Sequence, residues 1–136
     1  MISKRNAEHY TWGGDCDGWH LVKRDELSVI HERMPAGRAE VRHHHQTARQ
    51  LFFVLSGTLT MVLADRVEVI GSGEAVEIPP GSTIRCVSGC FRPTGPRRVT
   101  RAVCESHTTR FTSVWVRVAW GLCFARRMWS WRVMWR

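Results

Sequence analysis

The sequence has no long uninterrupted apolar run. No segment approaches the roughly 20 consecutive apolar residues that span a bilayer, because arginines interrupt every candidate after Val114. Polar residues and Trp-Gly-Gly follow the first methionine, in place of an apolar stretch with a small-residue cleavage site, so we expect no secretory signal. These absences predict a soluble, cytoplasmic protein.

Paired cysteines are also absent. The five cysteines are an odd number without a CxxC pair, which argues against a zinc ribbon or a fully paired disulfide framework. Cys86 and Cys90 together with His107 match no zinc-binding spacing. We therefore expect reduced thiols, as is usual in the cytosol.

Acidic residues are scarce in the last third of the chain. Residues 1–84 contain nine Lys or Arg against eleven Asp or Glu, whereas residues 85–136 contain eleven Arg, no Lys and one acid, Glu105. The second segment also holds five of the seven tryptophans. The length of 136 residues suits one core, so we divide the chain into one folded domain, 1–84, and an atypical basic tail, 85–136.

Short apolar runs, broken by turn residues about every ten positions, follow one another between His20 and Ile78. This rhythm is typical of an all-β sandwich or barrel, and no helix competes with it. The expected strands are 19–23, 27–34, 39–45, 50–55, 58–64, 66–70 and 75–78, with a further one at 110–118. The residues 85–101 are interpreted as a loop rich in Gly, Pro and Arg.

Three closely spaced residues carry the strongest chemical signal. His43 and His45 are two apart, so on a strand both imidazoles leave the same face while His44 leaves the other. Gln50, on the next predicted strand, supplies a third donor that could complete a facial set around a divalent ion. Imidazole and amide donors suit Mn, Fe, Co, Ni or Zn. A fortuitous metal-adhesive surface triplet is the alternative interpretation of the three histidines.

These residues resemble the first signature of the cupin superfamily: Gly, five residues, His-x-His, three or four residues, Glu, six residues, Gly. Gly37, His43, His45 and Gly57 keep its spacing, and Gln50 stands at the usual Glu. Gly73, Pro79 and Gly81 match the second signature, Gly, five residues, Pro-x-Gly, two residues, His. Its histidine, normally the remaining metal ligand, is replaced by Ile84.

The resemblance implies an antiparallel jelly-roll barrel, or double-stranded β-helix, that binds a divalent metal such as Mn, Fe, Ni or Zn through His43, His45 and Gln50. It implies a small polar ligand and chemistry of the isomerase, epimerase or dioxygenase type, in a homodimer. Catalytic residues are not identified; Glu77 and His44 are weak candidates for acid–base roles. The alternative is a non-catalytic ligand-binding cupin that has lost its metal.

Three interpretations of the tail, 85–136, are open. The reading frame could change near Ile84; a divergent segment could complete the barrel with the 110–118 strand; or the Arg/Trp-rich chain could bind anionic membranes or nucleic acid. Apolar residues of 119–136 fall on both sides of a helical wheel, so any helix there has poor amphipathicity. We accordingly expect an irregular or partly helical tail, and neither a nucleic-acid nor a membrane partner.

Overall fold

The computed structural model describes residues 1–89, 98–99 and 113–120. Within these residues the chain forms strands and turns, with no helix, which confirms the predicted all-β class. The strands are β1 (Glu8–Trp12), β2 (Cys16–Lys23), β3 (Leu27–Met34), β4 (His43–His44), β5 (Arg49–Ser56), β6 (Thr58–Val62), β7 (Arg66–Gly71), β8 (Ala75–Ile78), β9 (Thr83–Ser88), β10 (Arg98–Val99) and β11 (Ser113–Trp120).

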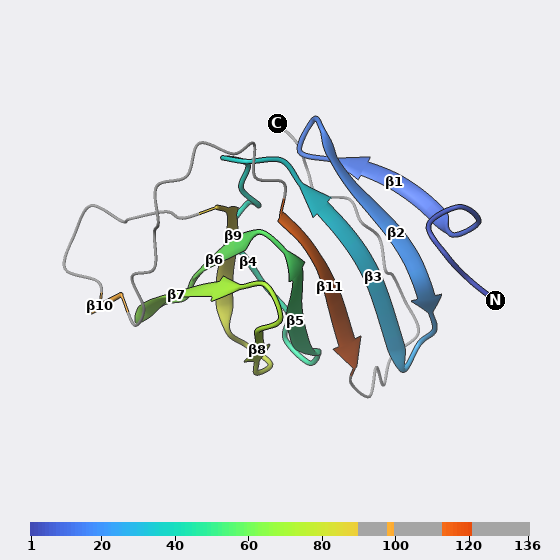
Figure 1. Ribbon diagram of the computed structural model, residues 1–136. Coiled ribbons are helices and arrows are strands. Elements are labelled where there is room, and N and C mark those ends of the chain that lie inside the picture. The colour runs from blue at the N-terminus through green and yellow to red at the C-terminus, as the bar shows by residue number, and fades with distance from the viewer. Residues whose placement is uncertain (90–97, 100–112, 121–136) are drawn as a thin grey trace.

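The strands form two sheets (Figure 1). The larger sheet has the order β1-β2-β3-β11-β5-β8, and the smaller has the order β10-β7-β6-β9-β4. Every pairing is antiparallel except that of the two-residue β10 with β7. Strands distant in the sequence therefore lie side by side, as in a jelly roll, where each sheet collects strands from both halves of the chain.

The core lies between the two sheets. Side chains of the larger sheet, among them Phe52 and Val54, share one buried cluster with Leu59, Met61 and Ile84 of the smaller sheet. The alternation of side chains along β5 explains which of its residues enter the core. Phe52 and Val54 are fully buried, whereas Phe53 and Leu55 face outward with 37% and 41% exposure. Burying such side chains is the main favourable contribution to folding.

Several elements differ from the sequence-based prediction. The strand β1 was not predicted, and it pairs with β2 of the same chain after a turn at Gly13 and Gly14. The predicted strand 39–45 is reduced to β4, whereas 35–42 forms turns and one isolated bridge to β9. The predicted loop 85–101 was wrong for residues 85–88, which belong to β9, and for residues 98–99, which form β10.

The predicted strand 110–118 corresponds to β11, which lies between β3 and β5 in the middle of the larger sheet (Figure 1). This insertion contributes backbone pairing on both sides, so β11 is integral to that sheet. The expected irregular or partly helical segment 119–136 was wrong for Ala119 and Trp120, which belong to β11, and its residues 121–136 fall outside the described residues. The part of the chain that the structure describes contains no helix long and apolar enough to cross a membrane.

Candidate metal centre

The two predicted histidine ligands lie together at the edge of the smaller sheet. His43 and His45 are half-buried while the intervening His44 is exposed, as expected for alternation around β4. The two inward imidazoles have ring centroids 5.2 Å apart and planes nearly perpendicular, at 89°. Imidazoles arranged in this way can direct nitrogen atoms toward one bound ion.

A backbone hydrogen bond orients His43. Its Nδ1 lies 3.0 Å from the carbonyl oxygen of Val41. Because a carbonyl can only accept, this bond places the proton on Nδ1 and leaves the lone pair on Nε2. Metal-binding histidines usually have their second ring nitrogen held in this manner, which sets both the tautomer and the ring orientation.

The backbone of His45 is held by the turn that precedes β9. The Gly81 amide donates a hydrogen bond of 2.7 Å to the His45 carbonyl oxygen. Gly81 has a φ of 79°, a left-handed conformation that glycine adopts without steric cost. The Pro-Pro-Gly turn of the second cupin-like signature therefore positions a residue of the first.

Gln50 lies on the inner face of the larger sheet, near the start of β5. It is 2% exposed and its backbone lies between Ile78 of β8 and Ala119 of β11. Its side chain points to the same face as Phe52 and Val54 of the core. The amide keeps an oxygen donor at this position without the negative charge of a glutamate.

Ile84 occupies a position directly across from His43. The two residues are cross-strand partners in the pairing of β4 with β9, so their side chains leave the same face. Ile84 is fully buried and belongs to the main core cluster. A hydrocarbon thus stands where a donor could have faced His43. Among the described residues, no group of three or more His, Cys, Asp or Glu side chains is arranged to hold a metal ion.

The two candidates for acid–base chemistry have different surroundings. Glu77 forms an ion pair with Arg49 across β8 and β5, and both side chains are about half exposed. The Glu77 carboxylate is therefore engaged with a neighbouring guanidinium on the sheet. His44 is exposed on the face opposite His43 and Ile84.

A buried carboxylate in the larger sheet was not identified from the sequence. Glu32 of β3 is 1% exposed and accepts a hydrogen bond of 3.1 Å from the hydroxyl of Tyr10 on β1. The tyrosine crosses the intervening strand at Gly18, where a Cβ atom would lie 2.2 Å from the ring. The three residues share one register row, Tyr10–Gly18–Glu32, and only knowledge of that register connects them.

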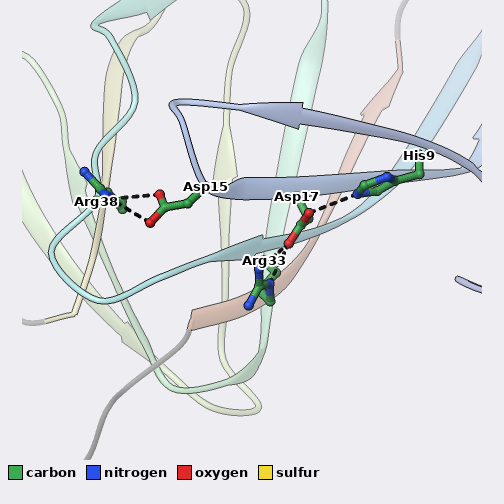
Figure 2. Close-up of polar contacts among 5 residues, drawn as sticks. All are labelled: His9, Asp15, Asp17, Arg33 and Arg38. Atoms are coloured by element: carbon green, nitrogen blue, oxygen red, sulfur yellow. Dashed lines mark hydrogen bonds and ion pairs between the residues drawn. The ribbon is translucent and has the colours of Figure 1, made fainter.

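Ion pairs link the β1–β2 hairpin to neighbouring segments (Figure 2). Asp17 accepts hydrogen bonds from Arg33 Nε at 2.7 Å and interacts with His9 Nε2 at 3.0 Å. Burial acts to raise the pKa of the Asp17 carboxyl, but these two hydrogen bonds outweigh it and the net shift is downward. Asp15 binds Arg38, 2.8 Å from its Nε, and so ties the hairpin turn to the segment before β4.

Comparison with known proteins identifies the domain. A family model described as "Cupin domain" matches residues 30–87, which include both histidines, Gln50 and Ile84. This chain carries a cupin domain. No curated protein matches the sequence.

Solved structures share the cupin fold over most of the chain. KdgF from Halomonas sp. is 12% identical, with a TM-score of 0.67 over 89% of this chain and 94% of its own. An RmlC-like cupin from Shewanella frigidimarina is 15% identical, with the same TM-score over 93% and 92%. A sugar phosphate isomerase of the cupin superfamily from Silicibacter pomeroyi is 14% identical, with a TM-score of 0.63 over 88% and 74%. At these identities the likeness establishes the fold.

Proposed function

We propose that this cupin domain binds a divalent metal ion through His43, His45 and Gln50 and presents it to a small polar molecule. The supporting observation is the paired imidazoles, with His43 oriented by Val41 so that Nε2 is free to coordinate. Two imidazoles and an amide form a neutral donor set that suits Mn, Fe, Ni or Zn. The residues present therefore fit an ion with open coordination positions.

Within such a site the protein residues would hold the metal ion and orient its ligand. The bound metal would supply Lewis acidity or a fixed point for a ligand oxygen. His43 is held by its own loop, and His45 by the amide of Gly81. Ile84 presents a buried hydrocarbon across from His43 and would contribute no donor to the ion.

We propose that the domain catalyses a reaction of the isomerase, epimerase or dioxygenase type. Its substrate would be a small polar molecule, such as a sugar or an organic acid. The solved cupin from Silicibacter pomeroyi described as a sugar phosphate isomerase is consistent with this class. Because one fold hosts many chemistries, the reaction has to be assigned from the site and not from the barrel.

We further propose that the protein acts in the cytoplasm as a homodimer and has neither nucleic-acid nor membrane partners. Within residues 1–84, which contain both cupin-like signatures, eleven acids against nine bases disfavour a polyanion partner for this domain, although the full chain has a net charge of +8. Analytical ultracentrifugation of the full chain tests the dimer, and a sedimenting mass of one chain at micromolar concentration contradicts it.

The metal proposal is tested by equilibrium dialysis of the full chain against Mn, Fe, Ni and Zn in turn, followed by elemental analysis. We expect about one ion per chain in the wild type and in His44→Ala, whose side chain points away from the site. His43→Ala and His45→Ala should each lose the ion. Equal loss in His44→Ala would indicate adhesion to a surface triplet.

A second candidate function is ligand binding without metal. The observation that favours it is Ile84, which replaces a donor across from His43 with a buried hydrocarbon. A wild-type chain that stays metal-free in all four dialyses supports this candidate and eliminates the first. Small-molecule binding would then be sought by thermal-shift measurement against sugars and organic acids.

A further inference from the structure

Two arginines that form no ion pair with any residue the structure describes lie on the outer surface of the smaller sheet, on the face opposite His43 and Ile84. Arg85 of β9 is exposed, because it follows the buried Ile84 on an alternating strand. Arg42 is also exposed and directly precedes β4. His43 pairs with Ile84 in the antiparallel register of β4 and β9. The next position in this register places Arg42 opposite Arg85.

A hydrogen bond places the Arg85 guanidinium beside the chain that carries Arg42. Its Nε lies 3.3 Å from the carbonyl oxygen of Glu40, two residues before Arg42. His44, the next outward residue of β4, pairs with Thr83 on the same exposed face. Two guanidinium groups and one imidazole thus border one patch, which we call the Arg42 patch (Arg42, His44, Thr83 and Arg85).

Within the described part of the chain, no carboxylate forms an ion pair with the arginines of this patch, Arg42 and Arg85. Four other arginines do form ion pairs: Arg33, Arg38, Arg49 and Arg66. Like charges facing one another across a strand pair are unfavourable. A doubly charged oxyanion would relieve this repulsion, and guanidinium groups bind phosphate oxygens through paired hydrogen bonds.

We propose that the Arg42 patch binds the phosphate group of a small phosphomonoester. The site is independent of the proposed metal centre because its side chains leave the opposite face of β4 and β9. A polynucleotide is a poorer fit, since such binding commonly uses six or more phosphate contacts. Two arginines and a histidine suit one phosphate.

Isothermal titration calorimetry of the full chain with glycerol 3-phosphate, inorganic phosphate and glycerol tests the proposal. We expect glycerol 3-phosphate and inorganic phosphate to bind and glycerol not to bind. Arg42→Gln and Arg85→Gln should each weaken binding about tenfold or more, which is the scale of one charge-assisted contact. Tighter binding of glycerol 3-phosphate than of phosphate would assign the ligand to a phosphomonoester rather than to the free ion.

Arg24→Gln is the matched control, because Arg24 is exposed, forms no ion pair among the described residues and lies in the turn between β2 and β3 of the larger sheet. This variant should bind phosphate like the wild type. The proposal is overturned if neither phosphate compound binds at millimolar concentration, or if Arg24→Gln weakens binding as much as Arg42→Gln. A single-stranded oligonucleotide that binds more tightly, with steep salt dependence, would also overturn it. Circular dichroism of each variant confirms folding, and unchanged metal content separates this result from the metal proposal.

Discussion

At the scale of single residues, position 84 controls how many donors face His43. Ile84 lies across from His43 on the same face, so a histidine there adds a third imidazole to the site. We predict that Ile84→His raises affinity for Ni or Zn about tenfold or more, comparable with the effect of supporting residues at known metal sites. Calorimetric titration measures the gain.

The same substitution places a polar ring in the core, so apo Ile84→His should lose about 1–3 kcal/mol of unfolding free energy in urea. Ile84→Leu is the control, because it keeps the hydrocarbon and should leave metal affinity unchanged. An Ile84→His protein with wild-type metal affinity would show that position 84 does not face the ion.

Two cysteines should be chemically inert in the folded protein. Cys16 and Cys86 are buried, and burial, the largest effect, raises the pKa of the Cys16 thiol to about 11. Since the thiolate is the reactive form, we predict that N-ethylmaleimide at pH 7.5 modifies neither residue until the protein unfolds. Peptide mass spectrometry after timed labelling checks this prediction. Rapid labelling of either residue in the native protein would mean that the core opens locally.

At the scale of elements, the β1–β2 hairpin is joined to β3 by the contact of Tyr10 with Glu32 over Gly18. We predict that Gly18→Ala destabilises the protein by about 1–3 kcal/mol, because its methyl group would overlap the Tyr10 ring. Urea denaturation measures the change. In a Tyr10→Ala background the same substitution should cost much less, and an equal cost in both backgrounds would exclude the clash as its cause.

The ion pairs of Asp17 predict an acid-sensitive hairpin. A carboxyl whose pKa is lowered in the folded state binds fewer protons than in the unfolded chain, so its stabilisation is present above pH 4 and is lost as pH falls through the folded pKa. Asp17→Asn should therefore flatten the decline of the urea midpoint between pH 5 and pH 3. Asp25→Asn, which alters an exposed carboxylate, should keep the wild-type decline.

Prediction from sequence succeeded where it depended on local spacing. The two-residue period of strands places His43 and His45 on one face and His44 on the other without knowledge of the remaining fold. The strand β9 contains an equally local signal, with Ile84 and Cys86 inward around an exposed Arg85. This strand was not predicted, because its outward-facing Arg85 resembles the Arg-rich sequence that follows.

Features that depend on long-range register were beyond the reach of sequence. The placement of Tyr10 over Gly18 requires the pairing of β1 with β2 and of β2 with β3. The position of β11 between β3 and β5 likewise depends on a strand that returns from far along the chain. The division at residue 84 stays a prediction, although β9 continues to Ser88 and β11 pairs within the larger sheet.

At the scale of the whole molecule, the half-buried His43 of β4 and the adjoining His45 come from the smaller sheet, and the buried Gln50 of β5 comes from the larger sheet. We propose that these three residues coordinate one ion. X-ray absorption spectroscopy of the full chain loaded with one equivalent of Zn measures the ligands directly. We predict a first shell of two imidazole nitrogens with oxygen donors in the wild type, and loss of this two-imidazole shell together with the ion in His43→Ala. A wild-type shell without imidazole, or a two-imidazole shell that persists in His43→Ala, would show that these residues do not hold the ion.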